Sequence, residues 1–361
     1  MNASATIRPV PRPILVTGGC GFVGCNIADA LARRGDQVLI LDSFARAGTE
    51  ENAAWLRERH GNRVVIETAD IRDAQAVHDM VARASAVLHL AGQVAVTSSL
   101  DSPIEDFEIN ARGTLNVLEA VRAAGGSRPV VFASTNKVYG KLLTDSDIDH
   151  VGERYEPLEV GLALGVDENA PLDFYSPYGC SKGTADQYVR DYARVFGLRS
   201  AVLRMSCIYG PRQFGTEDQG WIAHFLIRAI RGEPITIYGD GYQVRDALFI
   251  GDAVNAWLAT LDGIDAVSGR IFNLGGGPSN TVSLRELIAH IGILRGHAPE
   301  VDYQGWRPGD QPWYVSDIRA IKSALGWEPQ VSFREGLARL EHWLAQRFEH
   351  PQPALMGGAR A

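Results

Sequence analysis

Short runs of Val, Ile and Leu alternate with longer segments of mixed polarity through the first 200 residues of the chain. The runs are almost continuously apolar, which is typical of parallel strands that are buried on both faces. They lie at residues 14–17, 37–41, 63–67, 86–90, 130–134 and 200–203. The segments between them, such as 22–34 and 106–124, repeat apolar residues at helical spacing. Strands alternating with amphipathic helices predict an α/β fold, a Rossmann-type doubly wound parallel sheet.

This rhythm is interrupted in two places. Residues 141–173 are acidic and show no clear period, so we expect a long excursion over the mouth of a cleft, where long loops usually have a function. After Arg204 the chain is rich in Gly, Pro, Trp and Tyr, with helical patterns at 221–231, 284–295 and 333–349. The predicted organisation is a first domain at 13–204, joined by the returning segment 246–274, a smaller C-terminal lobe at 205–347, and flexible tails at 1–12 and 351–361.

Composition and charge narrow the class of ligand. The 361 residues include 35 Lys and Arg against 43 Asp and Glu, with no basic block, which argues against binding to nucleic acid or an anionic membrane. No apolar leader or membrane-spanning stretch is apparent, so we expect a cytoplasmic protein. The four cysteines have neither paired spacing nor nearby histidines. We therefore expect no metal site and no disulfide framework.

A glycine array follows the first predicted strand and opens a helix. Gly18 permits a tight turn, Gly21 lets the backbone approach a pyrophosphate at the helix N-terminus, and Gly24 allows close packing of helix on strand. Asp42, 18 residues after Gly24, ends the second strand, where a carboxylate accepts from ribose hydroxyls and repels a 2′-phosphate. The pattern predicts NAD rather than NADP, although Arg46 lies close enough to weaken that preference. The alternative is a purely structural glycine turn.

Further cofactor contacts are expected where other strands end, because ligands of this architecture lie at the carboxyl edge of the sheet. The residues predicted to contact NAD are Gly18, Gly21, Phe22, Val23, Gly24, Asp42, Ser43, Asp70, Ile71, Leu90, Ala91, Gln93, Asn110, Ser134, Tyr178 and Lys182.

Three residues form the predicted catalytic group. Tyr178 and Lys182 are four apart on one helix, so the ammonium lies beside the phenol and favours its ionised form. Thr135, at the end of the fifth strand, supplies a hydroxyl that orients the substrate oxygen. Together they can take a proton from an alcohol while its carbon loses hydride. Residues 179–183 also fit the G-x-S-x-G elbow of hydrolases, but the loop before them is not the strand which that motif requires.

With the glycine array, Asp42, Thr135, Tyr178 and Lys182, the chain resembles an extended short-chain dehydrogenase/reductase of the nucleotide-sugar epimerase and dehydratase group, over about residues 14–346. Within this group it is similar to the 2-epimerases of CDP-linked deoxysugars. The similar segments are 18–22, 89–95, 134–140, 141–173, 176–183 and 218–221.

The resemblance implies how a nucleotide sugar is held. Arg245 and Arg307 would hold the substrate diphosphate, and Asp310 would contact the nucleoside ribose. Cys207 stands where many epimerases of the group carry Asn, so nearby sugar contacts are expected to differ. A homo-oligomer is implied, with the helix at 106–124 packing on a partner. The predicted substrate residues are Asn136, Cys207, Gln219, Trp221, Gln243, Arg245, Arg307 and Asp310.

The residues after Thr135 indicate the type of reaction. Dehydratases of the group carry an Asp-Glu pair at this position for eliminating water, whereas this chain has Asn136 and Lys137. The resemblance therefore implies inversion at C2 of the sugar through a ketone intermediate, with NAD holding the hydride in the meantime. A UDP-sugar 4-epimerase or decarboxylase with the same catalytic group is an alternative. A silent NAD-binding sensor is another.

Overall fold

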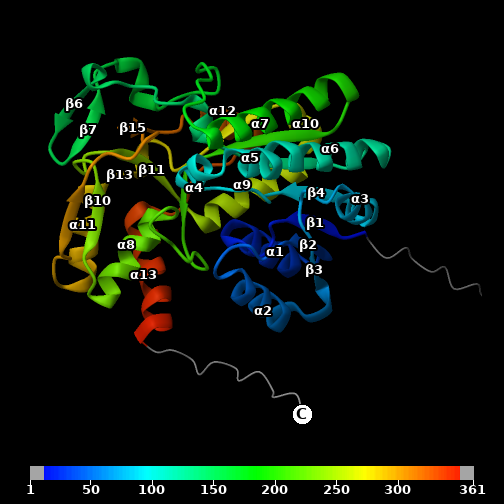
Figure 1. Ribbon diagram of the computed structural model, residues 1–361, viewed down its shortest axis with the longest axis horizontal. Coiled ribbons are helices and arrows are strands. Elements are labelled where there is room, and N and C mark those ends of the chain that lie inside the picture. Colours follow the sequence, from blue (N-terminus) through cyan, green and yellow to red (C-terminus); the bar gives the residue numbers. More distant parts are fainter. Residues whose placement is uncertain (1–11, 350–361) are drawn as a thin grey trace, which may run out of the picture.

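The computed structural model describes residues 12–349, and its centre is a sheet of seven parallel strands (Figure 1). The strand order β12-β8-β5-β4-β1-β2-β3 is doubly wound around β1 and β4, which confirms the predicted fold class. The second and third strands each begin one residue later than predicted. The strands are β1 (Ile14–Thr17), β2 (Val38–Asp42), β3 (Val64–Thr68), β4 (Ala86–His89), β5 (Val130–Thr135), β8 (Ser200–Met205) and β12 (Ile271–Leu274).

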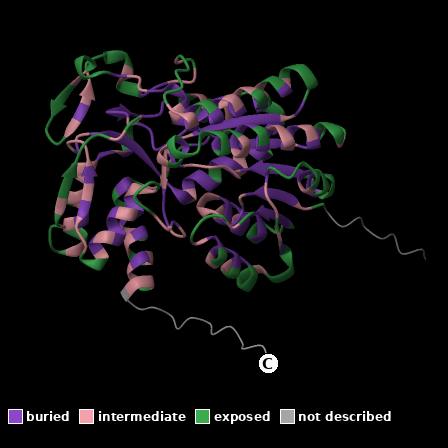
Figure 2. Ribbon diagram, in the orientation of Figure 1, coloured by how far each residue is buried: buried purple, intermediate pink, exposed green. Residues whose placement is uncertain are grey.

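Helices cover both faces of this sheet (Figure 1). One face carries α1 (Phe22–Arg34), α2 (Thr49–His60) and α9 (Ile250–Asp262), and the other carries α3 (Ala74–Arg83), α6 (Gly113–Ala123) and α7 (Pro177–Phe196). Most strands between them are buried on both faces, as Figure 2 shows, whereas the edge strand β3 is largely open, with Val64 its buried residue. Local signals fix the helix starts, because Asp73 caps α3 and Ser176 caps α7 directly before Pro177.

The helix expected at 106–124 has a more complex form. It begins earlier, as α5 (Pro103–Phe107), widens into a π-helical turn (Glu108–Arg112) and continues as α6. A π turn holds one more residue than an α turn, and such turns are frequent at functional sites. Asn110 lies in this turn, and its side chain bonds to groups outside the helix. The short helix α4 (Val96–Asp101) precedes α5.

The second lobe is built around a four-stranded sheet. Its strands are β9 (Cys207–Tyr209), β11 (Val244–Phe249), β13 (Thr281–Ser283) and β15 (Trp313–Tyr314), while β10 (Ile235–Tyr238) pairs with β14 (Val301–Gln304). Its helices α8 (Trp221–Arg231), α11 (Leu284–Arg295) and α13 (Phe333–Glu349) have the predicted bounds. The chain also contains the short helices α10 (Ile264–Val267) and α12 (Arg319–Leu325). Only Ser206 separates β9 from β8, so the polypeptide passes directly from one sheet to the other.

The excursion at 141–173 contains regular structure that its sequence did not predict. It contains a hairpin of β6 (Ile148–Val151) and β7 (Arg154–Pro157), which lies against the second lobe. Arg154 bonds to both carboxylate oxygens of Glu286 on α11, and the amide of Tyr155 donates to the carbonyl of Tyr242. Only Tyr155 is buried in the hairpin, so the sequence shows no alternation of apolar and polar residues.

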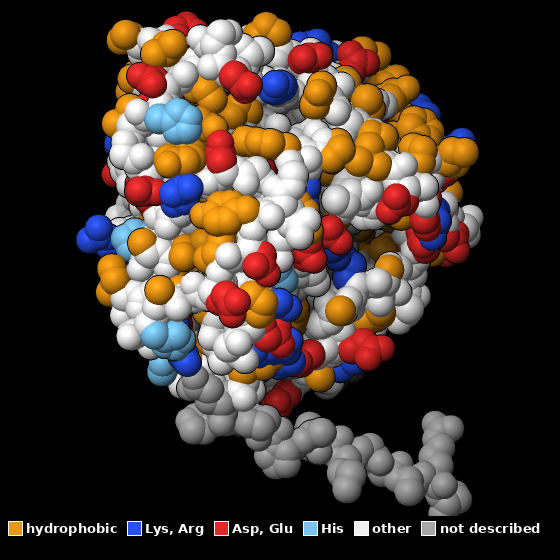
Figure 3. Space-filling view, turned by 60° about the vertical axis from the view of Figure 1, so that its left-hand side comes forward, with side chains coloured by type: hydrophobic (Ala, Val, Ile, Leu, Met, Phe, Trp, Pro, Cys, Tyr) orange, Lys and Arg blue, Asp and Glu red, His pale blue; other side chains and the backbone are white. Residues whose placement is uncertain are grey.

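The segment at 246–274 spans α9 and β12, which belong to the layers of the first sheet. The tails expected at 1–12 and 351–361 lie outside the described residues, apart from Arg12. Within residues 12–349, no helix is long and apolar enough to cross a membrane. Acidic and basic side chains are interspersed on the face in Figure 3, so this face carries no large patch of a single sign.

Candidate active site

Two glycines of the turn after β1 are closed in by backbone atoms. A Cβ on Gly18 would lie 2.8 Å from the amide nitrogen of Ala91, and one on Gly24 would lie 2.2 Å from the carbonyl oxygen of Gly18. Gly21 precedes α1 and offers no side-chain cap to its first amides. The turn therefore presents free N–H groups at the positive end of a 13-residue helix, which fits a dinucleotide pyrophosphate.

Asp42 lies beside this turn at the end of β2. Its carboxylate accepts hydrogen bonds from the backbone nitrogens of Cys20 and Phe44, both at 2.9 Å, and burial raises its pKa. A carboxylate has about four lone-pair sites, so acceptor capacity remains for ribose hydroxyls. Burial lowers the pKa of Arg46, and the charges of Tyr178 and Asp218 oppose this shift.

The other predicted cofactor residues fall into two groups. The first lies at the carboxyl edge of the sheet with exposed or pocket-lining atoms: Phe22, Val23, Ser43, Leu90, Ala91 and Ser134. The second is engaged within the protein. Asp70 pairs with Arg72 at 2.7 Å, and the side chain of Ile71 is buried against α6. Asn110 accepts from the amide of Gln93, so it holds the loop after β4.

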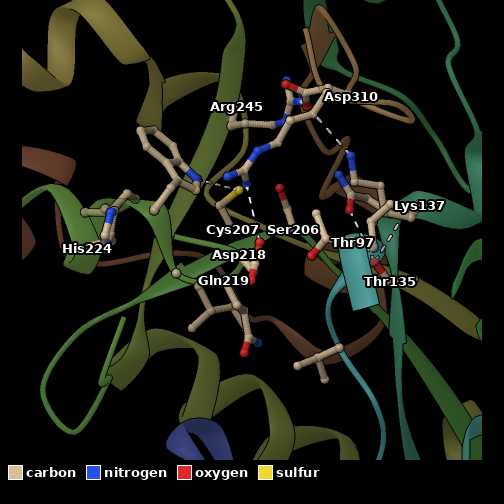
Figure 4. A pocket seen from close by; sticks show the side chains of 18 of the residues that line it. Thr97, Thr135, Lys137, Ser206, Cys207, Asp218, Gln219, His224, Arg245 and Asp310 are labelled. Atoms are coloured by element: carbon tan, nitrogen blue, oxygen red, sulfur yellow. Dashed lines mark hydrogen bonds and ion pairs between the residues drawn. The ribbon is translucent and has the colours of Figure 1, made fainter. Parts of the chain in front are cut away.

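A cavity of about 380 Å³ lies between the two sheets and meets the ends of β5 and β8 (Figure 4). All eight predicted substrate residues line it, although they come from segments up to 174 positions apart, from Asn136 to Asp310. Thr135 and Tyr178 line the same cavity. The structure thus brings Thr135 and Tyr178 together with the predicted substrate residues, whereas Lys182, the third predicted catalytic residue, does not line the cavity.

Tyr178 and Thr135 interact directly across this cavity, because the Thr135 side chain hydrogen-bonds the Tyr178 phenol. The expected depression of the Tyr178 pKa is wrong for the protein alone. Burial raises the pKa of Tyr178 to about 12, and the charge of Asp106 adds to the rise, while Thr135 and Arg46 oppose it. Burial also lowers the pKa of Lys182 to about 7, and its Nζ lies over the Phe132 ring, 4.3 Å from the centroid.

A buried network lies behind the catalytic pair. The Ser181 hydroxyl donates to Asp106, and the Asn110 amide donates to Asp106 at 3.2 Å and to Ser181 at 3.0 Å. Asp106 acts on the pKa of both Tyr178 and Lys182, raising each. Asp106 therefore acts on both residues of the predicted acid–base pair, an effect that the sequence gave no reason to expect.

The two arginines predicted to anchor the substrate diphosphate each pair with an acidic side chain of the protein. Arg245 bonds to Asp310 at 2.7 Å. Arg307 bonds to Glu217 at 2.9 Å and stacks over the Tyr238 ring, 3.7 Å from its centroid. Both arginines keep further N–H donors, because a guanidinium carries five.

Cys207 is held at the cavity wall by a side chain from α8. The indole nitrogen of Trp221 donates to its sulfur at 3.4 Å, and burial raises the pKa of the thiol. Cys207 therefore offers the pocket a weak sulfur contact in place of an amide. Within the described residues all four cysteines are free, and no group of three or more potential metal ligands occurs.

Three buried oxygens at the cavity have no hydrogen-bond partner: Thr97 Oγ1, Gln213 Oε1 and Gln243 Oε1. In both glutamines the amide nitrogen is bonded to a backbone carbonyl, which turns the oxygen toward other partners. Unpaired buried acceptors are costly, so they are ready contacts for donors of a ligand. Thr97 and Gln213 were not predicted as site residues from the sequence. Thr97 closely follows the motif at 89–95, whereas Gln213 has no signal in the sequence.

The chain belongs to the NAD dependent epimerase/dehydratase family, whose model matches residues 14–275. The predicted family resemblance is confirmed, and NAD is the cofactor. The chain is 40% identical over 337 residues to the CDP-paratose 2-epimerase of Salmonella typhi, covering 91% of this chain and 98% of that one.

Two solved structures are also similar. The UDP-glucose 4-epimerase of Thermotoga maritima with UDP-glucose has a TM-score of 0.80 at 29% identity and covers 93% of this chain and 99% of that one. The UDP-glucose 4-epimerase of Thermus thermophilus in complex with NAD has a TM-score of 0.78 at 33% identity, with coverages of 92% and 98%.

Proposed function

We propose that the protein is an NAD-dependent isomerase that inverts C2 of CDP-paratose to give CDP-tyvelose. The observation that carries this proposal is the cavity in which Thr135 and Tyr178 meet Asn136 and Lys137 rather than a pair of acids. The identity with a CDP-paratose 2-epimerase over almost all of both chains supports the same substrate. Because membranes retain charged nucleotides, we expect the reaction in the cytoplasm.

Tyr178 is the proposed proton acceptor for the C2 hydroxyl, and Thr135 orients that oxygen through its own hydroxyl. Bound NAD⁺ supplies the hydride acceptor and donor, and its positive charge lowers the pKa of a neighbouring phenol. Lys182, on the same face of α7, stabilises the ionised phenol. No carboxylate immediately follows Thr135 to eliminate water, so oxidation at C2 leads to a ketone.

Inversion requires the keto sugar to present its other face while the nucleotide stays anchored. Arg245 and Arg307 are the proposed anchors of the diphosphate, because guanidinium groups bind phosphate oxygens bidentately. Asp310 is the proposed contact of the nucleoside ribose. The proton held at Tyr178 then returns to the C2 oxygen as the carbon is reduced from the opposite face.

The test uses CDP-paratose carrying deuterium at C2 in ordinary water. Hydride transfer predicts that the label is found at C2 of the product, because a hydride does not exchange with solvent during turnover. Loss of the label to water would contradict this chemistry. Inversion at C4, or turnover of UDP-sugars alone, would instead favour the 4-epimerase class represented by the structurally similar enzymes.

We also propose that the protein is a homo-oligomer. Apolar side chains are exposed on the neighbouring helices α5 and α7, among them Ile104 at 79% and Val195 at 61%. Covering such side chains favours association of two identical faces. Light scattering of the wild-type protein and of Ile104→Glu tests this, since a dimer should dissociate in the variant. A monomeric wild-type protein would contradict it.

A further inference from the structure

Lys137 connects the reaction centre to the anchors of the substrate, yet no role has been given to it so far. It lies in a short 3-10 helix (Asn136–Tyr139) directly after β5. Its backbone nitrogen donates to the Thr135 hydroxyl at 3.2 Å. Its Nζ lies at the other end, donating to the carbonyl of Gly309 at 3.3 Å and lying 4.0 Å from Asp310 Oδ1 (Figure 4).

The cluster formed by Lys137, Arg245 and Asp310 carries one excess positive charge. The groups that act on the Lys137 ammonium are Asp310, which pairs with Arg245, then Arg245 itself and the Cys207 thiol. Two cations therefore share one carboxylate, and burial lowers the pKa of Lys137 to about 8. An anion that entered between Lys137 and Arg245 would relieve this imbalance and strengthen binding in a water-poor cavity.

The hydroxyl of Thr135 and the proposed diphosphate anchor Arg245 thus lie at opposite ends of the Lys137 residue. This separation matches the short distance between C2 and the β-phosphate in a nucleotide sugar. In a nucleotide sugar the β-phosphate is joined through one oxygen to C1, and C2 is the carbon next to C1. C4 lies across the ring and much farther from the phosphate. A sugar with C2 at Thr135 and Tyr178 therefore brings its β-phosphate to the ammonium of Lys137.

We propose that Lys137 binds the β-phosphate of the substrate and thereby fixes C2, rather than C4, as the carbon presented to Thr135 and Tyr178. The inference rests on the proposed function and deepens it, because it assigns the choice of carbon to one residue. Lys137 also acts as the pivot of inversion, because it holds the phosphate in place while the keto sugar rotates. With the phosphate held beside C1, rotation of the keto sugar moves C2 only a short way, so the ketone stays bound until it is reduced.

Binding of CDP and CMP tests the phosphate contact without any turnover. CDP keeps the β-phosphate and CMP lacks it. Lys137→Met should weaken CDP binding roughly 10-fold or more and leave CMP binding within about twofold, because one charge-assisted hydrogen bond is lost. Lys137→Arg should restore most of the CDP affinity. The control is Lys322→Met, which removes an exposed lysine that pairs with Glu328. Thermal unfolding of each variant identifies any misfolded protein.

Equal weakening of CDP and CMP, or no weakening of either, would overturn the proposal. If wild-type protein prefers another base, the matching diphosphate and monophosphate are used.

A second readout follows the reduced cofactor during turnover of CDP-paratose. Loss of the pivot in Lys137→Met should let the ketone escape, so reduced nicotinamide accumulates and is seen by its near-ultraviolet absorption. Wild-type protein and Lys137→Arg should return to the oxidised form. Absence of accumulation together with a wild-type rate would count against the pivot. Failure of wild-type protein to invert C2 would instead refute the proposed function, while the CDP and CMP comparison would still decide whether Lys137 binds phosphate.

Discussion

Asp186 of α7 and Arg204 of β8 form a two-bond ion pair that is closed to solvent. Nε of Arg204 bonds to Oδ2 at 2.9 Å and Nη2 bonds to Oδ1 at 3.1 Å, with side-chain exposures of 2% and 0%. Asp186 also accepts from the hydroxyl of Ser134, at 2.8 Å, next to the catalytic threonine. The ion pair therefore joins α7, which carries Tyr178 and Lys182, to β8, and the bond from Ser134 joins Asp186 to β5, the strand that carries Thr135.

Asp186→Asn should strongly destabilise the fold. The substitution leaves the Arg204 guanidinium buried without its counter-charge, which typically costs about 3–5 kcal/mol of unfolding free energy. Urea denaturation measures the change. Glu335→Gln is the control, because it breaks an exposed pair with Arg339 and should cost less than about 1 kcal/mol. Equal stability of the two variants would show that the buried pair has no special role.

Tyr178→Phe should lower kcat by about 100-fold or more, because only the proton-accepting oxygen is lost. The content of NAD and the affinity for CDP should stay close to those of the wild-type protein. Tyr188→Phe, on the exposed side of the same helix, is the matched control and should keep full activity. A near wild-type rate for Tyr178→Phe would mean that another group is the base.

Asp106→Asn should shift the pH dependence of turnover. The negative charge of Asp106 raises the pKa of Tyr178, so its removal lowers that pKa. The ionised phenol then forms at lower pH, and the acidic limb of the kcat profile should move down by roughly one pH unit. Glu105→Gln, an exposed neighbour on α5, should leave the profile unchanged. A shift to higher pH would contradict the assigned direction.

Gly24→Ala should reduce the NAD retained by purified protein. The added Cβ would lie 2.2 Å from the carbonyl of Gly18, so the cofactor turn must move. The measurement is the dinucleotide released when the protein is denatured. Gly292→Ala, in α11, is the control, since its Cβ would meet only ordinary contacts at 3.5 Å or more, with His297 and Ala298. If both variants retain wild-type amounts of NAD, the turn does not hold the pyrophosphate.

The sequence predicted those parts of the site that follow from local rules. The glycine turn, Asp42 and the spacing of Tyr178 and Lys182 each depend on one strand end or one helix face, which periodicity reveals. The motifs carried by the family resemblance extended this to residues far apart, such as Arg245 and Asp310.

Properties set by tertiary packing were not predictable. Gln213 gave no signal because its unpaired oxygen depends on the bond from its own amide nitrogen to the carbonyl of Ile208. The raised pKa of Tyr178 likewise follows from burial, which neighbouring residues in the sequence do not reveal. The hairpin at 148–157 was missed because its support comes from Glu286 and Tyr242, far along the chain.

Among the described residues, the edge strand β12 pairs with β8 alone, and it is made from residues 271–274, after the first part of the second lobe. α9, which packs on α1, also comes late. During synthesis, the cofactor domain therefore cannot close its sheet until the chain has passed residue 274. A gene fragment ending at residue 205 would leave β8 as an open edge and would lack the contact of α1 with α9, and such a fragment should aggregate rather than fold.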